Sequence, residues 1–116
     1  MPDWFTNSVE VRFLDLNKVL EDLRRAAAEL RAGRSEVLRV FLFGSLVRGN
    51  WTADSDADVI VLVDRDFDGL EGRGRYFLRS KLIPVDTLVY SRREFEQLAG
   101  EPGSFLAQNL ETALEL

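Results

Sequence analysis

Two aspartates that stand one residue apart, Asp56 and Asp58, open an apolar run that has the composition of a buried β-strand. Residues i and i+2 of a strand point to the same face, so their Cα atoms are expected about 7 Å apart with both carboxylates on one side. Like charges at this spacing repel each other unless a cation lies between them. Hard divalent ions such as Mg²⁺ prefer such oxygen ligands and take the rest from water and substrate phosphates. The pair therefore predicts a divalent-metal site.

Gly44 and Ser45 end the preceding apolar run and have the features of a phosphate site. Glycine allows a sharp turn and lets a ligand approach the backbone closely. If Ser45 begins a helical turn, the free N–H groups at its start favour an anion. We therefore expect phosphate groups on Gly44 and Ser45, beside a metal ion on Asp56 and Asp58.

The residue types that are missing narrow the chemistry. The chain of 116 residues contains no Cys and no His, which excludes disulfides, zinc–thiolate sites and a Ser-His-Asp triad. Any chemistry therefore rests on carboxylates, hydroxyls, Arg, Lys or an oxygen-bound metal. The net charge of −5 argues against a general nucleic-acid-binding surface, which needs an excess of Lys and Arg.

Length and hydropathy are those of one small globular domain. The chain is 46% hydrophobic, enough for one core, and we expect a single domain over residues 1–116 with residues 1–8 flexible. No stretch reaches the roughly 20 apolar residues that cross a bilayer, and the N-terminus lacks the basic and apolar regions of a signal peptide. We therefore expect a cytoplasmic protein without a membrane partner.

Apolar periodicity predicts the first elements of the domain. Alternation at Val9, Val11 and Phe13 predicts a short, half-exposed strand. Asp15 is expected to cap the amphipathic helix that follows, and the helix is expected to end near Gly33.

The rest of the chain alternates strands and helices. Three apolar runs predict core strands, over residues 36–44, 58–64 and 85–90. A helical turn is expected from Ser45, and a Gly-rich charged loop after the second strand. Further helices are expected over 73–81, with Tyr76, Phe77 and Leu78 inward, over 91–99 behind a capping box, and from Ser104 with an apolar face of Phe105, Leu106, Leu110, Ala113 and Leu114. The fold class is therefore α/β (α+β), a small mixed β-sheet of three or four strands with helices packed on it.

The two halves of the site belong to one longer motif, which is Leu42-Phe43-Gly44-Ser45-x-x-Arg48-Gly49, then five residues, then Ser55-Asp56-x-Asp58. It resembles the signature of the minimal nucleotidyltransferases, a branch of the DNA polymerase β-like nucleotidyltransferase superfamily that is found in HEPN/MNT toxin–antitoxin pairs. The resemblance extends over most of the chain and implies the polymerase β-like nucleotidyltransferase fold.

The resemblance also implies a third carboxylate on a neighbouring strand, and Asp86 is the only acidic residue of the third predicted strand. It implies Asp56, Asp58 and Asp86 as catalytic metal ligands, with two Mg²⁺ ions during catalysis. The alternative for Asp86 is a strand-edge side chain that accepts a hydrogen bond from a backbone amide.

The nucleotide side of the implied site consists of Gly44, Ser45, Arg48 and Ser55. Gly44 and Ser45 would hold the β- and γ-phosphates of ATP. For Arg48 two interpretations stay open, contact with phosphate or an ion pair that braces the loop. Ser55 is equally a residue that forms a turn. Trp51, in the same polar loop, could stack on a base, pack beneath the loop or lie in an interface.

The implied reaction is transfer of a nucleoside monophosphate, AMP from ATP, to an acceptor hydroxyl. The acceptor surface would come from a partner, and the resemblance implies a tyrosine of a HEPN-domain protein, with the chain as antitoxin; a homodimer mate is a further expectation. Two alternatives remain open. One is a non-catalytic antitoxin or assembly subunit, and the other is a transferase for small molecules, as in the aminoglycoside-modifying relatives.

Overall fold

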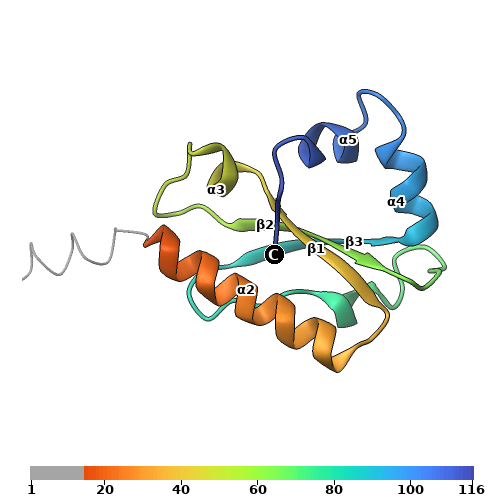
Figure 1. Ribbon diagram of the computed structural model, residues 1–116, viewed down its shortest axis with the longest axis horizontal. Helices are drawn as coiled ribbons and strands as arrows, with labels where there is room; N and C mark the ends of the chain where they lie inside the picture. Colours follow the sequence, from red (N-terminus) through yellow and green to blue (C-terminus); the bar gives the residue numbers. More distant parts are fainter. Residues whose placement is uncertain (1–14) are drawn as a thin grey trace, which may run out of the picture.

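The computed structural model describes residues 15–116, so the strand predicted at Val9, Val11 and Phe13 and the flexible segment 1–8 lie outside the described residues. Most of the described elements follow the predicted order (Figure 1). In order, they are α2 (Leu16–Gly33), β1 (Val37–Phe43), α3 (Ser45–Arg48), β2 (Ala57–Val63), the 3₁₀ turn η1 (Arg73–Tyr76), β3 (Val85–Ser91), α4 (Arg92–Ala99), α5 (Phe105–Leu110) and β4 (Leu114–Glu115).

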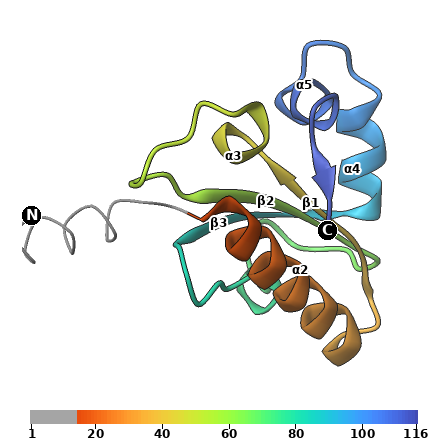
Figure 2. The same cartoon turned by 60° about the vertical axis from the view of Figure 1, so that its left-hand side comes forward.

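The strands form one mixed sheet in the order β3-β2-β1-β4. β1 is antiparallel to both β2 and β4, whereas β2 and β3 are parallel. Helix α2 covers one face of the sheet, and α4 and α5 cover the other (Figures 1 and 2). The predicted fold class, a small mixed sheet with helices packed on it, is confirmed.

Helix α2 forms where its cap and its apolar spacing predict it. The Asp15 carboxylate accepts a hydrogen bond from the Lys18 N–H at 3.2 Å, and the helix ends at Gly33. Three- and four-residue spacing places one apolar stripe on the sheet, made by Val19, Leu23, Ala26 and Ala27, all of which are buried.

The central strands are buried on both faces, which explains their continuous apolar sequence. In β2, Val59, Val61 and Val63 pack in the core beneath α2, while Ile60 packs against the opposite layer. This burial fixes the direction of each side chain along β2, because a shift by one residue would exchange the two faces.

The helix predicted over residues 73–81 is not formed. Only Arg73–Tyr76 make a 3₁₀ turn, and then the backbone extends, with the Leu78 N–H donating to the Thr87 hydroxyl at 3.1 Å. Tyr76 and Leu78 point inward as predicted, but Phe77 is exposed. The hydrogen bond from Leu78 to Thr87 of β3 takes the place of a helical hydrogen bond. In this conformation Tyr76 and Leu78 reach the core.

The last predicted helix is shorter than its apolar pattern. Helix α5 begins after its Ser104 cap and ends at Leu110, so Ala113 and Leu114 lie beyond it. Leu114 instead pairs with Leu42 in the sheet as part of β4. Of the predicted apolar face Leu106 is buried, whereas Phe105 is exposed.

Strand β3 is an edge strand, contrary to its prediction as a core strand. It pairs only with β2 within residues 15–116. Val89 is buried, but Asp86 and Leu88 are exposed.

No helix within residues 15–116 is long and apolar enough to span a bilayer.

The Asp22 carboxylate ties α2 to the segment that leads into β3. It accepts hydrogen bonds from the Ser80 hydroxyl at 2.7 Å and the Lys81 N–H at 2.8 Å. These bonds lower the pKa of Asp22 to about 2. A lowered native pKa stabilises the fold fully above the unfolded value, and this contribution is lost as the pH falls towards 2.

We expect Asp22→Ala to lower the free energy of unfolding at pH 7 by about 1 kcal/mol, because the Ser80 hydroxyl, the Lys81 N–H and the Arg25 guanidinium lose a charged acceptor. Its stability should also fall less than that of the wild type between pH 5 and pH 2. Urea unfolding across this range measures both effects. Glu21→Ala, at the exposed neighbouring position, is the control; the same pH dependence in Asp22→Ala and the wild type would contradict the assignment.

Candidate active site

Four of the seven predicted site residues, Gly44, Arg48, Asp58 and Asp86, line an open cavity of about 350 Å³. Three strands and two helices, or the residues next to them, contribute its walls, and the lining residues are Phe43, Gly44, Arg48, Asp58, Asp86, Leu88, Phe105 and Asn109. The cavity thus joins both halves of the long motif to the third predicted carboxylate.

Asp58 and Asp86 face each other in register on the parallel strands β2 and β3. Strands in a sheet lie about 4.8 Å apart, so in-register side chains on one face are direct neighbours. Burial, followed by the negative charges of Asp86 and Asp56, raises the pKa of Asp58, while Arg48 acts in the opposite direction. The fold therefore concentrates negative charge that a cation would neutralise.

Asp56 occupies a different position from the one predicted on a shared strand face. It lies one residue before β2, is exposed, and does not line the cavity. Its charge nevertheless acts on Asp58. Asp86 is likewise exposed, although its strand was predicted to be a core strand.

The donor set of the cavity suits Mg²⁺, because two carboxylates meet there without a neutralising ion pair within 4 Å among the described residues. However, no three acidic side chains within residues 15–116 are grouped to hold one ion. The assignment of all three aspartates as metal ligands therefore stays a prediction.

Gly44 turns the chain from β1 into α3 in a conformation that only glycine adopts easily. Its φ is +81°, and a Cβ at this position would collide with the Asp58 carboxylate oxygen Oδ2. The Gly44 carbonyl accepts from the N–H groups of Val47 and Arg48. The predicted helical turn from Ser45 is thus formed, and Gly44 lets it lie against Asp58.

We expect Gly44→Ala to destabilise the fold by about 1–3 kcal/mol, because it strains the backbone. It should also weaken Mg²⁺-dependent ATP binding at least tenfold by displacing Asp58. Thermal unfolding and calorimetric titration measure these effects. Gly33→Ala, whose added methyl meets nothing within 4 Å, is the control and should bind ATP normally. An unchanged ATP affinity in Gly44→Ala would show that ATP binding does not require the close packing of Gly44 on Asp58.

Arg48, Ser55 and Trp51 differ in their position relative to the cavity. Arg48 is exposed and lines it, without an ion pair within 4 Å to any described carboxylate. Ser55 forms a turn with Thr52, since its hydroxyl accepts from the Thr52 N–H at 2.8 Å and its own N–H donates to the Thr52 carbonyl at 3.1 Å. Trp51 is half-buried and packs against the core on the α2 side. Contacts of Ser45, Arg48 or Ser55 with a nucleotide stay predictions.

Four lining residues were not identified as site residues from the sequence, namely Phe43, Leu88, Phe105 and Asn109. Phe105 packs edge-on against Phe43 with ring centres 5.7 Å apart, and more than half of its side chain is exposed. Asn109 donates to the Phe105 carbonyl at 2.8 Å. The Ser104 cap fixes where α5 starts, but no local signal shows that α5 borders the carboxylates.

The chain is similar to known nucleotidyltransferases in sequence and in fold. The sequence model of a family described as "Nucleotidyltransferase domain" matches residues 18–115. The chain is 43% identical over 64 residues to "Putative protein adenylyltransferase MJ0604" of Methanocaldococcus jannaschii, a match over 55% of this chain and 64% of that relative. It therefore spans less than two thirds of that relative's length.

Among solved structures, the fold is similar to one described as a "putative nucleotidyltransferase" from Sulfolobus solfataricus. The TM-score is 0.50 at 20% identity, with 77% of this chain and 78% of the other covered. At this identity the likeness concerns the fold alone.

Proposed function

The chain belongs to the nucleotidyltransferase domain family, and on this premise we propose that it transfers AMP from ATP to a hydroxyl group of a protein. The observation that carries the proposal is the in-register pair Asp58 and Asp86 beside the Gly44 turn, in one open cavity. The name of the archaeal relative, a putative protein adenylyltransferase, supports AMP as the transferred group and protein as the acceptor.

In the proposed reaction, the acceptor oxygen forms a bond to the α-phosphorus of ATP. The bond from this phosphorus to the oxygen that bridges to the β-phosphate breaks, and pyrophosphate leaves with the electron pair. Asp86 takes the hydroxyl proton, while Gly44 and Ser45 hold the β- and γ-phosphates. Asp58, Asp86 and Asp56 would hold Mg²⁺, which supplies positive charge opposite the phosphates when bound.

For the acceptor, we propose a tyrosine of a HEPN-domain partner, with the chain as the antitoxin of a toxin–antitoxin pair. The motif from Leu42 to Asp58 supports this, since it resembles the minimal nucleotidyltransferases of such pairs. A second candidate is an antitoxin that binds its partner without transfer. The exposed position of Asp56, outside the cavity, favours that candidate, because it leaves two carboxylates where the reaction would use three.

The test combines nucleotide binding with transfer. Calorimetric titration should detect ATP binding that requires Mg²⁺. Incubation with α-labelled ATP and a co-expressed HEPN-domain protein should label that protein, and mass spectrometry should find one added AMP. Binding of ATP without metal dependence, or neutralisation of the partner without any added AMP, would contradict the proposed transfer.

A further inference from the structure

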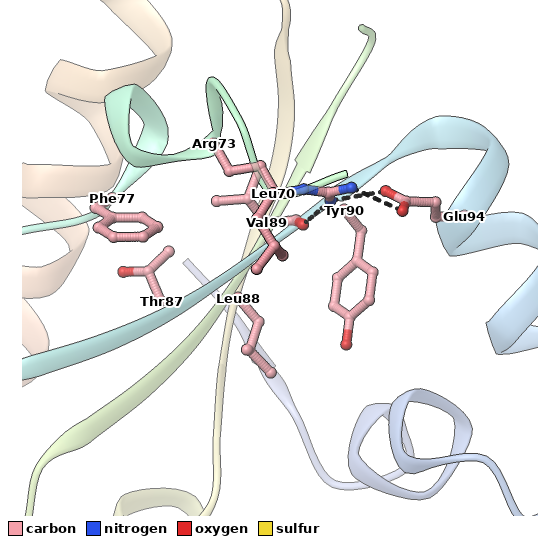
Figure 3. Close-up of a pocket in the computed structure, with 8 residues that line it drawn as sticks. All are labelled: Leu70, Arg73, Phe77, Thr87, Leu88, Val89, Tyr90 and Glu94. Carbon is pink, nitrogen blue, oxygen red and sulfur yellow. Dashed lines mark hydrogen bonds and ion pairs between the residues drawn. The ribbon is translucent and has the colours of Figure 1, made fainter. Parts of the chain in front are cut away.

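A second groove, of about 410 Å³, follows the outer edge of β3 (Figure 3). Thr87 and Val89 contribute from one face of the strand, and Leu88 and Tyr90 from the other. Side chains of both faces line one groove only where it runs along the edge of a sheet. The groove therefore exposes the side of β3 that faces away from β2.

The backbone groups along this edge are available for pairing. The Ala57 N–H donates to the Pro84 carbonyl at 2.9 Å, so residues 84, 86, 88 and 90 face β2 and residues 85, 87 and 89 face outward. Among the described residues, the N–H and C=O of Thr87 and the N–H of Val89 have no hydrogen-bond partner. Three neighbouring backbone groups are thus open to an added strand.

One end of the open edge is closed. Arg73 donates from Nη1 to the Val89 carbonyl at 2.6 Å and forms an ion pair with Glu94 at 2.8 Å (Figure 3). Arg73 thus satisfies the Val89 carbonyl, the next acceptor on the outward edge, and its ion pair with Glu94 lies across the groove. An added strand could therefore pair with residues 85–89 but not continue along β3 beyond them.

The side chains beside the open edge are apolar and exposed. Leu70 is 87% exposed, Phe77 49% and Leu88 39%. They come from the loop before η1, the segment after it, and β3 itself. Large apolar side chains next to unpaired strand groups are the features of sites that bind extended peptides by strand addition.

The groove adjoins the carboxylate cavity at Leu88. Leu88 lines both, and Asp86 precedes it by two residues on the same face of β3. A strand added to β3 would lie about 4.8 Å away, so a side chain that it directs to this face would reach the neighbourhood of Asp86. A hydroxyl side chain could thus enter the cavity while its backbone pairs with Thr87.

We propose that the β3-edge groove, lined by Leu70, Phe77 and residues 87–90, binds the acceptor protein. The occupant is an extended segment of that protein, with apolar side chains at alternate positions around the hydroxyl residue that receives AMP. The inference rests on the proposed transfer to protein and adds where the acceptor binds. The position of the groove next to the carboxylate cavity, with Leu88 lining both, favours an acceptor segment over a second copy of this chain.

The probes for a test are nine-residue synthetic peptides that carry one central Tyr, Ser or Thr and Val or Leu at alternate positions. Their binding to the full chain is measured by fluorescence polarisation, and protection of the Thr87 and Val89 amides by NMR hydrogen exchange. Leu70→Asp and Phe77→Asp place charge in the groove at exposed positions. Leu82→Asp is the matched control, because Leu82 is 53% exposed and lines neither cavity.

We expect the peptides to bind the wild type and the Leu82→Asp control and to protect both amides. Leu70→Asp and Phe77→Asp should weaken peptide binding at least tenfold with unchanged ATP affinity. Absence of peptide binding at millimolar concentration, or equal binding by all variants, overturns the groove proposal. The proposal is also overturned if light scattering shows that the wild type is a dimer and that Leu70→Asp and Phe77→Asp are monomers. Failure of the proposed function can be distinguished from failure of the groove proposal. In that case ATP binding or transfer is absent while peptide binding persists.

Discussion

Asp58→Asn is expected to abolish Mg²⁺-dependent ATP binding, with an affinity loss of about a hundredfold or more, and to remove transfer with it. Asparagine keeps the shape of the side chain but not the charge that attracts the cation. Because burial and the neighbouring aspartates raise the pKa of Asp58, its ionised form is costly at neutral pH. The variant should therefore be as stable as the wild type or more stable.

Calorimetric titration with ATP, with and without Mg²⁺, measures the binding change, and urea unfolding measures the stability. Asp54→Asn is the matched control, since Asp54 is exposed in the preceding loop and lines neither cavity. Equal and metal-independent ATP binding by the wild type and Asp58→Asn would contradict the metal site. Unfolding of the variant would contradict the repulsion that we infer from the register of β2 and β3.

Asp86→Ala is expected to separate nucleotide binding from transfer. Gly44, Ser45 and Asp58 remain to hold the nucleotide, so most of the ATP affinity should be kept. Transfer should fall by roughly two to four decades, the usual range for loss of a general base. The exposed position of Asp86 at the junction of the cavity and the β3-edge groove suits a group that meets the acceptor rather than the nucleotide.

The assay is incorporation of label from α-labelled ATP into a co-expressed acceptor protein, with mass spectrometry for the added AMP. Asp54→Ala serves as the control and should transfer at the wild-type rate. Transfer by Asp86→Ala at the wild-type rate would show that another group takes the proton. Equal losses of ATP affinity and transfer would instead make Asp86 a ligand for the nucleotide and its metal ion.

Local signals in the sequence were sufficient for much of the fold. The caps at Asp15, Ser91 and Ser104 each satisfy backbone N–H groups within three residues, and all three helices begin where predicted. The buried strands β1 and β2 followed from their continuous apolar runs, which two covering layers require. Local pattern failed where a distant partner competed, as for residues 73–81, where the Leu78 N–H bonds to Thr87.

The candidate active site was likewise only partly predictable from the sequence. The sequence by itself determined that Gly44-Ser45 and Asp56-x-Asp58 stand at the ends of two core strands that follow each other in the chain, because their spacing and the flanking apolar runs are local. Only the tertiary structure decided that Asp86 lies in register with Asp58, that Asp56 stays outside the cavity, and that β3 is an edge with an open groove. Strand order and register depend on pairing between residues far apart in the chain, and spacing along one strand carries no information about its neighbours.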